Sequence, residues 1–173
     1  MFGNNITVMD VCVSVGVILT IIQLFFMWKS ILADHERRKK QTTIEFYDNI
    51  NKETKKLNES FKDVLDKNRI TKEMLDDEKY TSFIEAANRY LTLMERFSVG
   101  VNTKVYDLKI FMRIAGRSTI NTFDQLREYI DLCRDGGKRS YMYTDFEKMV
   151  NAMRFEYTKS ERLQKDPQRI VHS

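Results

Sequence analysis

The chain has 173 residues, 42% hydrophobic and 31% charged, with a net charge of +4. Its only two histidines, His35 and His172, lie far apart in the sequence, which excludes Ser-His-Asp and Cys-His catalysis and the usual zinc sites. Six Gly, one Pro and no sustained alternation of apolar and polar residues indicate an all-α protein.

Residues 11–28, VCVSVGVILTIIQLFFMW, contain no charged side chain. As a helix this segment is roughly 27 Å long, close to the thickness of the hydrocarbon core of a bilayer. The preceding MFGNNITVMD has no Lys or Arg, and no small-x-small cleavage site follows, so a signal peptide is not favoured. We therefore predict an uncleaved transmembrane helix at 11–32 after a short extracytoplasmic N-terminus, residues 1–10.

Every Lys and Arg of the chain follows Trp28. Because basic residues collect on the cytoplasmic side, we expect the N-terminus outside a bacterial inner membrane and the remainder in the cytoplasm. Residues 33–42 are expected to form a basic juxtamembrane linker. Its cluster suits contact with anionic lipid headgroups, or serves only to set the topology, and without a basic face further along the chain no nucleic acid is expected. The cluster consists of Arg37, Arg38, Lys39 and Lys40.

Small residues recur every fourth position of the predicted span, at Cys12, Gly16 and Thr20, with Gln23 nearly one turn further on. Small side chains let two helix backbones approach closely, and a polar side chain in hydrocarbon seeks a partner. This face therefore predicts association of transmembrane helices, although ordinary span composition also explains small residues.

Helical spacing dominates the predicted cytoplasmic domain, residues 43–160, which precedes a flexible tail at 161–173. The first helix is expected from Asp34 to Lys67. Its apolar stripe fits packing within the chain or a coiled coil with a second copy, and the two threonines favour packing within the chain. The stripe comprises Thr43, Tyr47, Ile50, Thr54, Leu57, Phe61 and Val64.

Capping signals divide the rest of the domain. Gly100 and Gly116 are expected to end helices, Thr103 to begin one, and the sequences starting at Thr122 and Thr144 to form capping boxes. A short turn is expected at residues 71–75. The prediction is a bundle of about five helices, over residues 34–67, 80–99, 103–116, 122–134 and 144–160.

Two polar residues share one face of the helix at 80–99. Asn88 and Glu95 are seven residues apart, beside the apolar stripe, where a carboxylate can act as a base or a metal ligand. The favoured interpretation is structural, an ion pair between Glu95 and Arg113 or Arg127. With no glycine-rich phosphate loop in the sequence, we predict no catalytic, cofactor or metal site.

The order of motifs resembles an uncharacterised bacterial family of single-pass membrane proteins, domain of unknown function 4760. The similarity runs from the apolar segment to about Arg154. It implies that Asn88, Glu95 and Asp107 belong to a shared internal polar network, and it implies no activity. The motifs are the span and basic stretch, Thr43-Ile44-Glu45-Phe46-Tyr47, the segment Asn88 to Glu95, Tyr106-Asp107, Tyr129-Ile130 and Tyr143-Thr144-Asp145-Phe146-Glu147.

Three functions are compatible with these features. The favoured one is a non-enzymatic, membrane-anchored module that binds a protein partner or a second copy at the cytoplasmic surface. The second is a small toxin-like or anti-phage effector acting through oligomerisation of its transmembrane helix. An enzyme using Glu95 and Asp107 is the least favoured, and no cofactor is expected.

Overall fold

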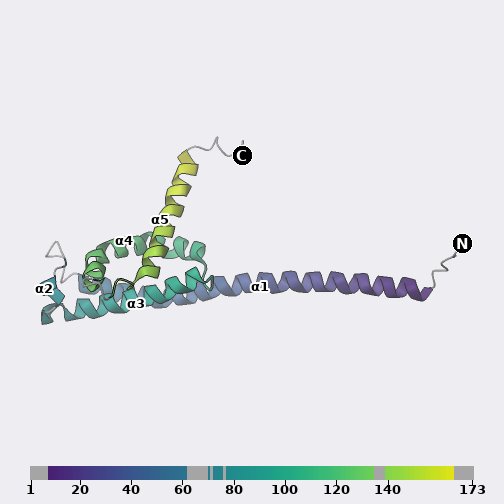
Figure 1. The fold of residues 1–173 in the computed structure, drawn as a ribbon, viewed down its shortest axis with the longest axis horizontal. Helices are drawn as coiled ribbons and strands as arrows, with labels where there is room; N and C mark the ends of the chain where they lie inside the picture. Colours follow the sequence, from purple (N-terminus) through teal and green to yellow (C-terminus); the bar gives the residue numbers. More distant parts are fainter. Residues whose placement is uncertain (1–7, 62–69, 71, 76, 135–138, 166–173) are drawn as a thin grey trace. The chain divides into compact units, whose positions relative to one another are not determined.

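The computed structural model describes residues 8–61, 70, 72–75, 77–134 and 139–165, and within these ranges every regular element is helical. This confirms the all-α prediction. The chain divides into two compact units, Met1–Lys39 and Lys40–Ser173. The elements are α1 Val8–Phe61, the short α2 Lys72–Leu75, the 3-10 turn η1 Glu78–Tyr80, α3 Thr81–Asn102, α4 Leu108–Arg134 and α5 Thr144–Lys165 (Figure 1).

The first unit contains the N-terminal part of α1. Among the described residues, one helix is long and apolar enough to cross a membrane, judged by length and composition alone. No residue in the most apolar part of this helix is buried. Residues 33–42, predicted as a linker, belong to α1 and are helical throughout.

The second unit begins with the C-terminal part of α1, which buries the stripe that the sequence predicted. Ile50, Leu57 and Phe61 are at most 7% exposed, and Thr43 is fully buried. The prediction of packing within the chain is confirmed to Phe61; Val64 lies outside the described residues. The ring centroids of Phe46 and Phe97 are 5.3 Å apart and those of Phe61 and Phe83 are 5.2 Å apart. This part of α1 and α3 are therefore antiparallel.

The helix α3 passes through Gly100 and ends at Asn102, so the predicted stop at Gly100 is wrong. A Cβ at this position would overlap the ring of Tyr106, which indicates that this glycine permits close packing. Thr103 is the C-cap of α3, and its hydroxyl donates a 2.9 Å hydrogen bond to the Val99 carbonyl. The prediction that Thr103 begins the next helix is therefore also wrong.

The two helices predicted at 103–116 and 122–134 form the single helix α4. Gly116 is buried inside this helix, where a Cβ would collide with the hydroxyl of Tyr157 on α5. Thr122, predicted to open a capping box, is buried in α4, and its hydroxyl donates to the Ser118 carbonyl at 2.9 Å. The described part of the domain thus has four long helical segments, because α4 continues through Gly116. The contact with Tyr157 explains why this position is a glycine.

The last helix, α5, begins where the sequence predicted and extends to Lys165. Phe146, Met149, Val150 and Met153 are buried in the core. Beyond Met153 no described side chain of α5 is buried, and Phe155 is 67% exposed. Figure 1 shows this half of α5 running outward from the other helices of its unit.

Candidate functional site

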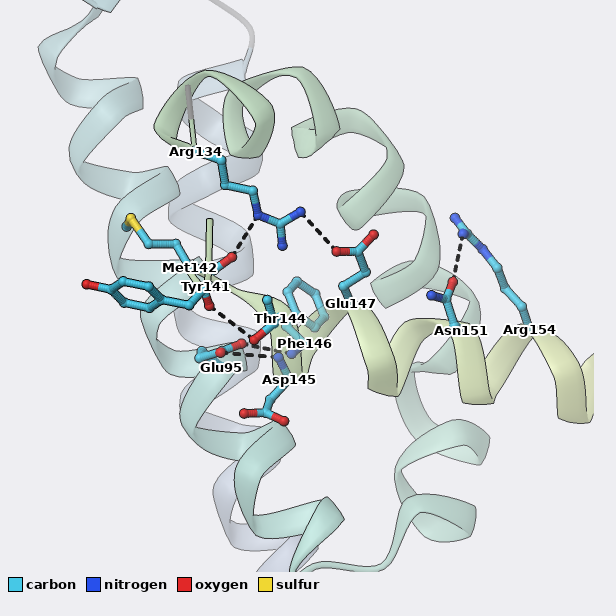
Figure 2. Close-up of polar contacts among 10 residues, drawn as sticks. All are labelled: Glu95, Arg134, Tyr141, Met142, Thr144, Asp145, Phe146, Glu147, Asn151 and Arg154. Atoms are coloured by element: carbon cyan, nitrogen blue, oxygen red, sulfur yellow. Dashed lines mark hydrogen bonds and ion pairs between the residues drawn. The ribbon is translucent and has the colours of Figure 1, made fainter. Parts of the chain in front are cut away.

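Glu95 lies at the junction between α3 and the start of α5 (Figure 2). Its Oε1 accepts a 3.2 Å hydrogen bond from the backbone N–H of Asp145, and its Oε2 accepts one of 2.8 Å from that of Phe146. The first amides of a helix lack partners within the helix, and the helix dipole favours a carboxylate there. Glu95 therefore caps α5, in place of the predicted ion pair with Arg113 or Arg127.

The predicted capping box at Thr144 does not form. Thr144 is the first residue of α5, and its hydroxyl donates to the Tyr141 carbonyl at 3.1 Å (Figure 2). The residue before it, Tyr143, is buried and has a positive φ of 58°. A residue from another helix therefore performs the capping that the local sequence indicated.

Arg134, the last residue of α4, strengthens the same junction. Its Nε donates to the Met142 carbonyl at 2.9 Å, and its Nη1 contacts Glu147 Oε2 at 2.9 Å. The Arg134 side chain is only 19% exposed, so this contact is partly shielded from water. The end of α4 is thus fastened to the first turn of α5, as Figure 2 shows.

Asp107 performs the corresponding function at the start of α4. Its Oδ1 accepts hydrogen bonds from the backbone amides of Lys109 at 2.9 Å and Ile110 at 3.1 Å. The Asp107 amide itself donates to Thr43 Oγ1, on the second-unit part of α1, at 2.8 Å. Asp107 is therefore the N-cap of α4 and also joins that helix to α1.

Asn88 accepts a 2.9 Å hydrogen bond from the hydroxyl of Tyr129 on α4. The pKa values of Tyr129, Cys133 and Tyr143 are all raised, in each case mainly by burial. These groups are consequently neutral near pH 7, because the charged form of each would be poorly solvated. A thiol whose pKa is raised is a weak nucleophile, so the cluster is suited to hydrogen bonding.

None of the described hydrogen bonds joins two of the three residues Asn88, Glu95 and Asp107. The side chains of Asn88 and Glu95 each connect two helices, whereas the Asp107 side chain caps its own helix and its backbone amide reaches α1. The partners of all three lie in other motifs that carried the family resemblance: Tyr129 for Asn88, Asp145 and Phe146 for Glu95, and Thr43 for Asp107. The sequence signal for these contacts is that each partner lies in another motif of the family. Residue spacing within a single helix does not reveal such contacts.

An open groove with a volume of about 870 Å³ lies between α4 and α5. Tyr157 joins the two helices there, because its hydroxyl donates to the Met112 carbonyl at 2.9 Å. The Arg117 guanidinium lies 5.7 Å from the Tyr157 ring centroid. The lining residues are Leu108, Lys109, Met112, Arg113, Ile114, Ala115, Gly116, Arg117, Ser118, Glu156, Tyr157 and Ser160. The sequence pattern does not indicate this groove, because Gly116 resembles a helix stop and separates the N-terminal half of α4 from the rest.

The residues predicted to associate in the membrane lie on α1. Thr20 donates its hydroxyl hydrogen bond to the Gly16 carbonyl at 2.9 Å, and a Cβ at Gly16 would meet no atom within 4 Å. Gln23 is exposed, whereas the side chain of Cys12 lies outside the described residues.

The predicted lipid-contacting residues Arg37, Arg38, Lys39 and Lys40 also lie on α1. Arg38 forms a 3.0 Å ion pair with Asp34, one turn earlier, and both side chains are more than half exposed. Such a solvated pair contributes little to stability. Arg37, Arg38 and Lys40 are exposed, and Lys39 is partly exposed. In the part of the chain that the structure describes, no group of three or more His, Cys, Asp or Glu is placed to hold a metal ion.

The model of the family described as domain of unknown function (DUF4760) matches residues 11–153. The chain belongs to the DUF4760 family. The match confirms the resemblance and contains all three polar junction residues, whereas the α5 wall of the groove lies beyond its end. No curated protein and no solved structure matches the chain.

Proposed function

We propose that this DUF4760 protein is a non-enzymatic adaptor, anchored in a bacterial cytoplasmic membrane by residues 11–32. In this proposal the N-terminus is outside, and the helical domain binds a protein partner or a second copy at the cytoplasmic surface. The asymmetric distribution of Lys and Arg supports the orientation. The basic cluster at 37–40 adds attraction to anionic lipid headgroups.

The observation that carries this proposal is the groove between α4 and α5. It leaves apolar side chains of α4 accessible beside basic ones, on a domain whose polar residues Asn88, Glu95 and Asp107 hold helices together. Exposed apolar surface bordered by charge is typical of protein interaction sites. The groove therefore supports binding to another protein more directly than it supports catalysis.

The test is purification of the tagged full-length chain from its native membranes in mild detergent, followed by mass spectrometry and measurement of the native mass. A stoichiometric companion protein, or a defined multimer of the chain, would support the adaptor function. A chain that purifies alone and monomeric would contradict it. An unrelated single-pass protein of similar abundance, purified in parallel, identifies companions that adhere to any membrane protein.

A second candidate is a small membrane effector that acts through assembly of its transmembrane helix. Gly16 favours this candidate, because apart from its chain neighbours and the backbone of its own helix no described atom lies within 4 Å of the position that its Cβ would occupy. A partner helix is therefore free to approach the backbone at this point. Overexpression tests this candidate. Cell growth should stop when the native chain is overexpressed and should continue when a substitution in the span prevents its assembly.

A further inference from the structure

Three basic side chains follow one line along α4, at the edge of the groove. Lys109, Arg113 and Arg117 are spaced by four residues, which places them on the same helix face. All three are exposed, and none forms an ion pair with another described side chain. Among the described residues that line the groove, Glu156 is the only acidic one beside three basic ones, so this lining has an excess of positive charge.

The surface between this basic row and α5 is apolar and helix-sized. It includes Leu108 and Met112, which are partly exposed, and Ala115, whereas Ile114 lies on the other side of the basic row. The α4 wall runs from Leu108 to Ser118. Ten residue steps correspond to roughly 15 Å, about three helical turns. A helix that binds in such a groove inserts apolar residues from one face at positions i, i+3 or i+4, and i+7.

We propose that the groove between α4 and α5 binds an amphipathic helix of a partner protein, with acidic residues flanking its apolar face. This inference rests on the proposed adaptor function and specifies the chemistry of the partner. The apolar face would contact Leu108 and Met112, while the acidic residues would pair with Arg113 and Arg117. Complementary charge would supply specificity and fast association, and the apolar contacts most of the affinity.

Two other occupants fit less well. The exposed half of α5 in a second copy carries two acidic residues, Glu156 and Glu161, but also Lys159 and Arg162, so its charge does not complement a basic groove. The flat surface of a bilayer would meet the rim of a groove between two helices and not its apolar floor. An acidic helix satisfies both the shape and the charge.

The experiment uses the full-length chain in nanodiscs of neutral phosphatidylcholine. A display library of helical peptides, about eighteen residues long, fixes apolar residues at i, i+3 or i+4 and i+7 and randomises the others among Glu, Lys, Gln and Ser. We expect the enriched peptides to be acidic. Binding of a selected peptide, measured by fluorescence anisotropy, should weaken by about tenfold or more in the R113E/R117E variant.

The matched control is K52E/K55E, which changes the net charge equally at two exposed α1 residues outside the groove. Its affinity for the selected peptide should stay within about twofold of the native value, apart from any long-range charge effect that added salt removes. Neutral or basic enriched peptides, or equal losses in both variants, would overturn the proposal. The proposal would also be overturned if no peptide were enriched and the native chain bound anionic vesicles while R113E/R117E did not.

Native purification separates failure of this inference from failure of the adaptor function. A stoichiometric companion that R113E/R117E retains would leave the adaptor function intact and exclude the groove as its site. Recovery of a multimer of the chain without a companion would replace the acidic partner by a second copy. A monomer purified alone would overturn the adaptor function and the groove proposal together.

Discussion

Glu95 and Phe146 are connected across 51 residues of sequence, because Glu95 Oε2 accepts a 2.8 Å hydrogen bond from the Phe146 amide. The Phe146 ring is fully buried, with its centroid 5.1 Å from that of Phe123 on α4 and 6.2 Å from that of Tyr90 on α3. The first turn of α5 is therefore held by a polar cap and by aromatic packing at the same position. A change in the cap should affect the stability of the domain.

Replacing Glu95 tests this cap. Glu95→Ala removes both acceptors from the first turn of α5 and should lower the free energy of unfolding by about 1–2 kcal/mol, as the loss of a helix N-cap does. Glu95→Gln retains one carbonyl oxygen and should cost less. Urea unfolding followed by far-ultraviolet circular dichroism measures both effects.

Glu85→Ala is the matched control, since Glu85 is on the same helix, is 63% exposed and contacts only Arg89, at 3.6 Å, among the described ion pairs. Such an exposed pair contributes less than about 1 kcal/mol. If Glu95→Ala and Glu85→Ala proved equally mild, the cap would contribute nothing to stability. That result would instead favour a role of the Glu95 carboxylate as a base or a metal ligand.

The periodicity of the sequence predicted the helices and their buried faces, because both depend on local spacing. The stripe from Thr43 to Phe61 and the core side of α5 are examples. Gly116 resembles a helix stop in the sequence, but the reason for a glycine there is Tyr157, which approaches from a different helix. Likewise Thr144 carries a local capping signal, but its helix is capped by Glu95 from α3. Tertiary contacts of this kind leave no trace in the spacing of residues.

The close approach at Gly116 predicts strong coupling with Tyr157. In an isolated helix Gly→Ala is stabilising by about 1 kcal/mol, but here the added Cβ would displace the Tyr157 hydroxyl from the Met112 carbonyl. Gly116→Ala should therefore be neutral or destabilising in the native chain and stabilising when combined with Tyr157→Phe. A double-mutant cycle of unfolding free energies measures this coupling. Additive effects within about 0.5 kcal/mol would show that the two positions are independent.

The hydrogen bonds of Asp107 predict that two single substitutions, one at Asp107 and one at Thr43, each lower the free energy of unfolding. Asp107→Ala leaves the first amides of α4 without their acceptor and should cost about 1 kcal/mol. Thr43→Val leaves the Asp107 amide without a partner and should cost about 1–3 kcal/mol, because Thr43 is fully buried. Lys109→Ala, at the exposed neighbouring position, is the control and should change the free energy of unfolding by less than about 0.5 kcal/mol.

The buried phenols predict loss of stability in alkali. Burial raises the pKa of Tyr90 and of Tyr129 above the ordinary value of 10.0. Between the ordinary and the raised pKa the unfolded state binds fewer protons than the folded state, so stability falls as pH rises. Their contribution is complete below about pH 10, and above it each group should lower the free energy of unfolding by up to about 1.4 kcal/mol per pH unit.

Unfolding experiments between about pH 8 and pH 11 check this dependence, with tyrosinate absorbance recorded in parallel. The slope should decrease in Tyr129→Phe, which also loses the hydrogen bond to Asn88. Tyr141→Phe is the control, since Tyr141 is 72% exposed. If the Tyr129 and Tyr141 variants had the same slope as the native chain, burial of Tyr129 would have no effect on its titration.

Gly16→Ile distinguishes the two candidate functions. A bulky side chain at Gly16 would separate the backbones of two associated spans, so cross-linking between copies and any toxicity of overexpression should both fall sharply. Val17→Ile, an equally apolar change at the next residue, lies on a different face of the helix and should change neither. The adaptor should still bind its companion with Ile at position 16, because the groove on α4 and α5 is untouched. Loss of the companion in Gly16→Ile, with Val17→Ile unaffected, would instead show that assembly of the span is needed for binding.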